Sequence, residues 1–141
     1  MTIRQLSVFL ENKSGRLTEV LETLGNEKIN ITALSIADTS EYGILRLIVS
    51  DPTKAHQLLK KKSFSVNLNE VISLWVSPEA GSYAKVLKCF SEDGLSIEYM
   101  YAFCLGDKSV LVLRTDNRPK AFETIKKYDL KVIREADLKH L

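Results

Sequence analysis

The chain has 141 residues, of which 45% are hydrophobic and 27% are charged, the composition of an ordinary soluble globular protein. Its net charge of +2 is too small to attract nucleic acid or an anionic membrane surface. Its two cysteines, in no CxxC arrangement, exclude a disulfide framework. Because the chain has neither a long apolar run nor a basic-then-apolar leader, we expect it to be cytoplasmic.

The first half predicts the order strand, helix, strand, strand, helix, strand. Apolar residues alternate before Gly15 and recur at helical spacing after it, which predicts a strand followed by an amphipathic helix. Turn residues at 39–43 predict a hairpin, and Asp51 with Pro52 is typical of a helix start. The predicted strands are 6–10, 29–36, 44–49 and 64–68, and the predicted helices begin at Gly15 and Asp51.

The second half repeats the first at an offset of 66 positions, without a gap. Gly15 falls on Gly81, for example, and the apolar patterns agree around them. We therefore predict two modules, 1–69 and 70–141, which are joined by a very short linker at 67–70 and pack rigidly. The predicted strands of the second module are 72–76, 95–103, 110–114 and 130–133, and its helices follow Gly81 and Asn117.

This element order predicts an α+β fold in which each module is ferredoxin-like, a four-stranded antiparallel sheet with both helices on one face. The other face of each sheet then has no helix to cover it. Alternation places apolar residues on that face, namely Phe9, Ile44, Ile48, Trp75, Val110 and Val112. We expect this face to meet the sheet of the other module, packed side by side with it, or a second subunit of a dimer.

Two turns, 12–17 and 78–83, share one pattern in which a glycine precedes a helix. The glycine allows a tight turn and a close approach by a ligand. The helix start that follows offers unpaired N–H groups and the positive end of a dipole, which suit a carboxylate. A simple tight turn capped by Asn12 explains the same residues, so the pattern alone leaves both interpretations open.

The residues Asn12-x-x-Gly15-x-Leu17, followed by Ile29-Asn30-Ile31, resemble the ACT domain, a ferredoxin-like regulatory module. The second half resembles it more loosely, through Gly81 and Leu95-Ser96-Ile97. Together the two copies resemble a stand-alone tandem ACT protein without an attached enzyme. The resemblance implies an allosteric sensor that binds a free amino acid or similar small effector between ACT modules, needs no cofactor or metal, and regulates a metabolic enzyme.

The resemblance also implies which residues bind the ligand. In the first module these are Asn12, Lys13, Ser14, Gly15, Arg16 and Leu17 from the turn, with Asn30, Ile31 and Thr32 from the next strand. In the second module they are Glu79, Ala80, Gly81, Ser82 and Tyr83, with Ser96, Ile97 and Glu98. The family's usual proline is Ser14 or Ala80 here, and its leucine is Tyr83 in the second copy. Because the copies also differ in charge, we expect one site or two unequal sites.

An enzyme is the first alternative, and the sequence disfavours it. Neither His56 nor His140 has a plausible catalytic partner nearby in sequence. Arg16 with Asn30 leaves an acylphosphatase-like reading open, because that fold has the same element order and uses an arginine and an asparagine. No Walker loop, HExxH motif or dinucleotide fingerprint is present.

Two binding alternatives remain. RNA-binding modules share this topology, and Tyr99, Tyr101 and Phe103 recur with period two. They share a phase with Leu95 and Ile97, however, so we expect them to pack in a core or an interface. The second alternative is a module that docks a metabolic enzyme through its apolar sheet face and senses no effector.

Overall fold

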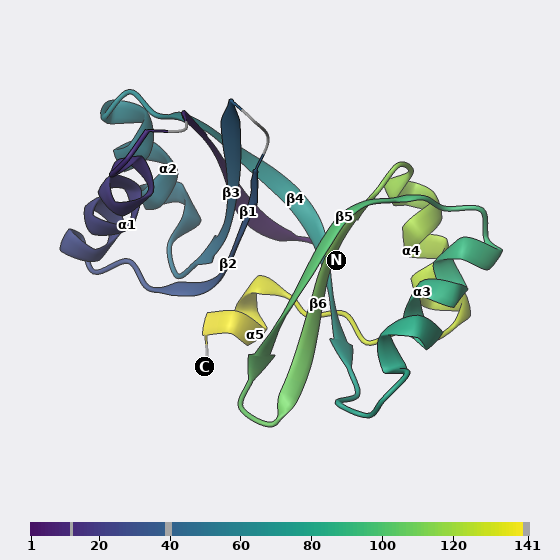
Figure 1. Cartoon of the computed structure of the whole chain (residues 1–141). Coiled ribbons are helices and arrows are strands. Elements are labelled where there is room, and N and C mark those ends of the chain that lie inside the picture. The colour runs from purple at the N-terminus through teal and green to yellow at the C-terminus, as the bar shows by residue number, and fades with distance from the viewer. Residues whose placement is uncertain (12, 39–40, 140–141) are drawn as a thin grey trace. The chain divides into compact units, whose positions relative to one another are not determined.

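The computed structural model describes residues 1–11, 13–38 and 41–139. Asn12, His140 and part of the predicted hairpin turn, 39–40, lie outside the described residues. In chain order the elements are β1 (Ile3–Glu11), α1 (Arg16–Asn26), β2 (Ile31–Asp38), β3 (Tyr42–Val49), α2 (Pro52–Lys61), β4 (Ser65–Val76), α3 (Ser82–Glu92), β5 (Ile97–Leu105), β6 (Lys108–Thr115), α4 (Arg118–Lys127) and α5 (Glu135–Lys139) (Figure 1).

The chain divides into two compact units. We call Arg4–Glu70 the first module, and Val71–Leu141 together with Met1–Ile3 the second module. The strands are hydrogen-bonded in the order β2-β3-β1-β4-β6-β5, so that β4 contributes residues to both units. The predicted linker at 67–70 is therefore wrong, because these residues belong to one continuous strand. Their asparagines suggested a turn, but Asn69 is accommodated within β4, where its Oδ1 accepts a 2.6 Å hydrogen bond from the Ser7 hydroxyl.

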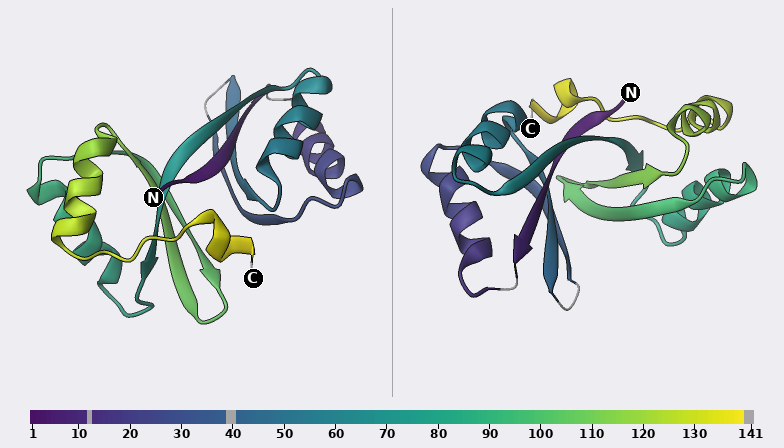
Figure 2. Two further views of the ribbon diagram at one scale, coloured as in Figure 1. Left: turned by 180° about the vertical axis from the view of Figure 1, so that it is seen from behind. Right: turned by 90° about the horizontal axis from the view of Figure 1, so that it is seen from above.

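In the first module, one face of the strands packs against both helices, as the ferredoxin-like fold requires (Figures 1 and 2). The alternation of β1 and the helical spacing of α1 and α2 place their apolar residues in one core. Asp51 accepts a hydrogen bond from the Lys54 N–H and Pro52 begins α2, as predicted. The fully buried core residues are Leu6, Val8, Val20, Leu24, Leu45, Leu47, Ala55 and Leu59.

The second module repeats this geometry in register. Leu10 pairs with Gly43 between β1 and β3, and Val76 pairs with Ser109 between β4 and β6. The module differs at its end, where the predicted strand at 130–133 is reduced to a single bridge between Leu74 and Val132. The chain then turns into the unpredicted helix α5, because the Arg134 N–H donates to the Asp137 carboxylate at the helix start.

The strand register shows whether the residues predicted for the helix-free face lie on the same side of the sheet. Phe9 lies opposite Ile44, and Trp75 lies opposite Val110, so these residues share faces as predicted. In the first module, however, the face is not purely apolar. Ser7 lies on it opposite Arg46, and the Gln5 amide donates to the Ser7 hydroxyl at 3.2 Å.

The phase predicted for the aromatic residues of β5 is wrong. A β-bulge lies between Ile97 and Tyr99, and the extra residue reverses the alternation of the side chains. Ile97 packs against the core of the second module. Tyr101 instead lies opposite Val112 and Phe103 opposite Val110, on the helix-free face. Simple alternation could not reveal a bulge, because the bulge arises from the pairing with β6.

Candidate functional site

The turn between β1 and α1 has the geometry that its glycine suggested. Gly15 precedes α1 with φ 87° and ψ −9°, a left-handed conformation that favours glycine. The first intrahelical bond runs from the Glu19 N–H to the Gly15 carbonyl at 2.9 Å. The N–H groups of Leu17 and Thr18 therefore have no acceptor within the helix. They lie at the end of α1 where the helix dipole also favours an anion.

A pocket of about 290 Å³ opens beside this turn, on the helix side of the sheet. This volume suits a small molecule, because it lies at the lower end of the usual range for ligand sites. Its apolar wall comes from β1, α1 and β2, and its polar wall comes from the turn, the start of α1 and the last residue of β1. The lining residues are Leu10, Glu11, Lys13, Ser14, Arg16, Leu17, Ile36 and Gly43.

Both signs of charge line the pocket. Lys13 Nζ lies 3.0 Å from Glu11 Oε2, and Arg16 Nη1 lies 2.9 Å from Glu19 Oε2. The hydrogen bond from Lys13 lowers the pKa of the Glu11 carboxyl and so favours its ionised form. The Arg16 guanidinium also stacks 4.4 Å from the centre of the Phe64 ring. Exposed ion pairs of this kind are weak, so their members can exchange partners for a ligand.

The predicted residues of the first module fall into two groups. Of the turn residues, Lys13, Ser14, Arg16 and Leu17 line the pocket, whereas Gly15 shapes the turn without lining it. The strand residues Asn30, Ile31 and Thr32 are not among the lining residues. Register explains this, because Ile31 pairs with Val49 at the end of β3 that is distant from Gly43. A role for these three residues in completing the site from a neighbouring module stays a prediction.

The second module has the same turn with different surroundings. Gly81 has φ 85° and ψ −3°, and the Ser82 N–H donates to the Glu79 carbonyl at 3.2 Å, with Ala80 between them. The hydroxyl groups of Tyr83 and Ser109 are hydrogen-bonded to each other.

The predicted strand residues of the second module have partners of their own. The Ser96 N–H donates to Asp116 Oδ1 at 3.1 Å, and Glu98 pairs with Arg114 at 3.3 Å. Ile97 packs against the core of the module. Any contact of these residues with a ligand stays a prediction.

Sequence reasoning missed half of the pocket wall: Leu10, Glu11, Ile36 and Gly43. Gly43 was predicted to lie in the hairpin turn, but it lies inside β3, where a glycine often marks a close approach of another group. Gly43 is buried, and a Cβ built on it would lie 3.6 Å from Ile36 Cδ1.

Comparisons with known proteins agree with this architecture. The ACT domain pair family matches residues 1–141, the whole chain. The chain belongs to the ACT domain pair family. An ACT domain pair is a regulatory module, so the ACT resemblance and the ferredoxin-like fold predicted from the sequence are confirmed. A search of curated proteins finds no match.

Two solved structures illustrate the likeness of this ACT pair. The protein BT0572 from Bacteroides thetaiotaomicron is 45% identical, with a TM-score of 0.92, and the alignment covers 100% of this chain and 98% of that one. The ligand-free regulatory subunit of aspartate kinase from Thermus thermophilus has a TM-score of 0.63 at 12% identity, and the alignment covers 88% and 91% of the two chains. The second likeness concerns the fold alone.

In the part of the chain that the structure describes, other features of the ACT pair form no second candidate centre. Among residues 1–11, 13–38 and 41–139, no group of three or more His, Cys, Asp or Glu residues could hold a metal ion. Within the same residues, no helix is long and apolar enough to cross a membrane. Cys89 is half-buried and donates from its Sγ to the Lys85 carbonyl, as a helical thiol commonly does.

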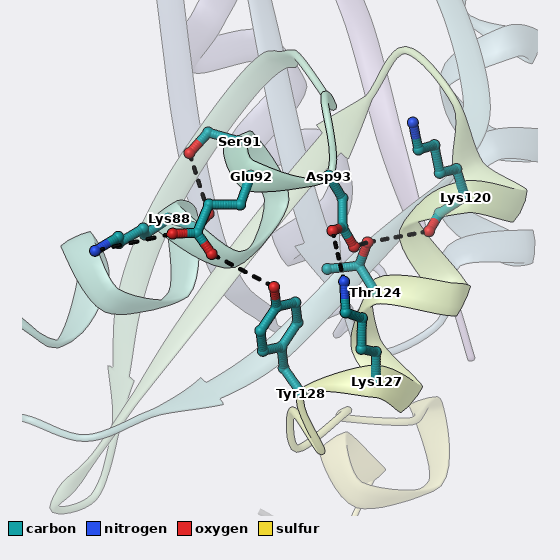
Figure 3. A network of polar contacts seen from close by, with 8 residues as sticks. All are labelled: Lys88, Ser91, Glu92, Asp93, Lys120, Thr124, Lys127 and Tyr128. Atoms are coloured by element: carbon teal, nitrogen blue, oxygen red, sulfur yellow. Dashed lines mark hydrogen bonds and ion pairs between the residues drawn. The ribbon is translucent and has the colours of Figure 1, made fainter.

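A polar network joins α3 to α4 in the second ACT module (Figure 3). Asp93 accepts hydrogen bonds from the buried Thr124 hydroxyl at 2.6 Å and from Lys127 Nζ at 3.1 Å. The Thr124 bond and Lys127 lower the pKa of the Asp93 carboxyl, and Asp93 raises the pKa of Lys127. Because each member is paired within the module, the network acts as a structural clasp between the two helices.

Proposed function

We propose that the first ACT module binds a free amino acid in the pocket beside Gly15 and that the chain acts as a regulatory effector sensor. One observation carries the proposal: the pocket combines an open helix start, both signs of charge and an apolar wall. These are the three features needed by a zwitterion with a side chain. The proposal extends the regulatory character of the ACT pair to a ligand.

Each part of an amino acid has a partner in this pocket. The carboxylate accepts from the N–H groups of Leu17 and Thr18 at the start of α1 and lies near the Arg16 guanidinium. The ammonium group binds the ionised Glu11 carboxylate in place of Lys13. The ligand side chain packs against the apolar wall, so we expect an amino acid with an apolar side chain.

We further propose that the chain is a homodimer whose second copy completes the site. The side chains of Leu34 and Ile36 project from the edge strand β2 and are 50% and 48% exposed. Apolar groups on a strand edge are typical of an interface. Ile36 also lines the pocket, so a copy that covers β2 would narrow its mouth. The regulated protein in this proposal is a metabolic enzyme.

Thermal melting with each of the twenty standard amino acids tests the proposal. A ligand at about 100 times its dissociation constant stabilises the folded state by about 2.7 kcal/mol, which raises the melting midpoint by several degrees. The decisive variant is Glu11→Gln, which removes the partner of the ammonium group, and we expect it to weaken binding at least tenfold.

Glu27→Gln is the matched control. Glu27 is also an exposed glutamate paired with a lysine, 3.4 Å from Lys54 Nζ, but it is not among the lining residues. Equal effects of the two variants, or no shift with any amino acid, would count against the proposed site.

A docking module without an effector is the second candidate. Its support is the set of large apolar side chains exposed on the first module, which are Phe9, Leu34, Ile36 and Tyr42. If no amino acid shifts the melting midpoint but an enzyme co-purifies with the wild type and not with Phe9→Lys, a substitution on the helix-free face, this second function is favoured.

A further inference from the structure

The two modules allow their sites to be compared position by position. The offset of 66 holds in the register of the strands, because Leu10 pairs with Gly43 as Val76 pairs with Ser109. Each pocket residue of the first module therefore has a structural counterpart in the second. In the order of the first pocket, the counterparts are Val76, Ser77, Glu79, Ala80, Ser82, Tyr83, Ala102 and Ser109.

Two of these differences add atoms where the first module is open. Tyr83 stands where the first module has Leu17, and Ser109 stands where it has Gly43. The two added hydroxyl groups are hydrogen-bonded to each other, so the Tyr83 side chain reaches from the start of α3 to the start of β6. Ala102 replaces the larger Ile36 at the third apolar position.

The charged residues of the first pocket also differ from their counterparts in the second module. The first pocket has two cations, Lys13 and Arg16, whose counterparts are Glu79 and Ser82. The counterpart of Glu11 is Ser77, and its hydroxyl already accepts a hydrogen bond from the Glu79 N–H at 3.3 Å. The second module thus has neither the cation that would meet a ligand carboxylate nor the carboxylate that would bind its ammonium group, because Ser82 and Ser77 replace Arg16 and Glu11.

We propose that Tyr83, which is 37% exposed and held by Ser109, is a plug that covers the site of the second ACT module. Resting on the function proposed above, this inference predicts that each chain takes up one amino acid, in the first module only. A ligand in the second module would have to displace the tyrosine ring and break its hydrogen bond. It would also find Ser82 where the first module offers the Arg16 guanidinium to the ligand carboxylate.

Calorimetric titration of the whole chain with each of the twenty amino acids, singly, measures the number of sites. We expect one site per chain in the wild type, no binding by Gly15→Asp, and one site with unchanged affinity in Gly81→Asp. The two variants are matched, because both glycines have nearly the same φ and a Cβ on either meets nothing within 4 Å. Two sites per chain, or a loss of binding in Gly81→Asp, would overturn the plug.

A second measurement needs no ligand and separates the two proposals. We expect Tyr83→Phe and Ser109→Ala each to lower the melting midpoint, and the double variant to lower it no further than one of them alone. Additive effects would show that the two hydroxyl groups do not act together, and would overturn the plug whatever binds elsewhere. Coupled hydroxyl groups with no heat from any amino acid would support the plug and reject the amino-acid site.

Discussion

Transferring the plug to the first module provides the sharpest test of how the two sites differ. The double variant Leu17→Tyr/Gly43→Ser places in the first pocket the pair that closes the second. The fold should accept the serine, because the atoms nearest to a Cβ on Gly43 belong to Ile36 and Ala37 and lie 3.6–3.9 Å away, which are ordinary contacts. The strand register around Gly43 is also the same as that around Ser109 in the second module.

The expected magnitudes differ between stability and binding. Removing a glycine from a strand stabilises it by roughly 0.5–1 kcal/mol, and a new hydrogen bond adds about 1 kcal/mol. Loss of the half-buried Leu17 offsets part of this, so the melting midpoint without ligand should remain close to that of the wild type. A saturating amino acid, which stabilises the wild type by about 2.7 kcal/mol at 100 times its dissociation constant, should leave the variant unchanged.

Thermal melting with and without the amino acid, followed by calorimetric titration, measures both quantities. Gly43→Ser alone is the control, because it adds the hydroxyl without the ring and should retain most of the binding. A double variant that melts like the wild type and binds as tightly would refute the reasoning. A double variant that fails to fold would refute the structural equivalence of the two pockets.

Three further predictions concern stability and can be measured by denaturation. Asp51→Ala and Asn117→Ala each remove a side chain that accepts a hydrogen bond from the N–H group three residues later. Each should therefore lower the free energy of unfolding by about 1 kcal/mol, and the two losses should add. Leu59→Ala leaves a cavity at a fully buried site and should lower the free energy of unfolding by roughly 2–5 kcal/mol. Leu34→Ala, at a half-exposed site, should lower it much less. The lowered pKa of Asp93 stabilises the fold at pH values above the ordinary carboxyl pKa, and this stabilisation is lost as pH falls through the lowered value. Asp93→Asn should therefore make the free energy of unfolding depend less on pH in the acid range. An unchanged pH dependence would refute the clasp.

Local chemistry made much of this protein predictable from its sequence. The order of elements follows from alternation and helical spacing, which act within a few residues. The starts of α2 and α4 follow from Asp51 and Asn117, and the left-handed turns follow from Gly15 and Gly81. The repeat then extended each of these predictions from one module to the other. Three polar residues of the pocket wall, Lys13, Ser14 and Arg16, lie within the predicted turn, whereas Glu11 precedes it.

Only the tertiary structure decided which distant residues meet. Ile36 and Gly43 reach the pocket through the registers of β2 and β1 against β3. The bulge after Ile97 redirects the aromatic residues of β5, and the Tyr83–Ser109 hydrogen bond joins positions 26 residues apart. The physical reason is that strand register depends on the partner strand, and a shift by one residue moves every later side chain to the opposite face.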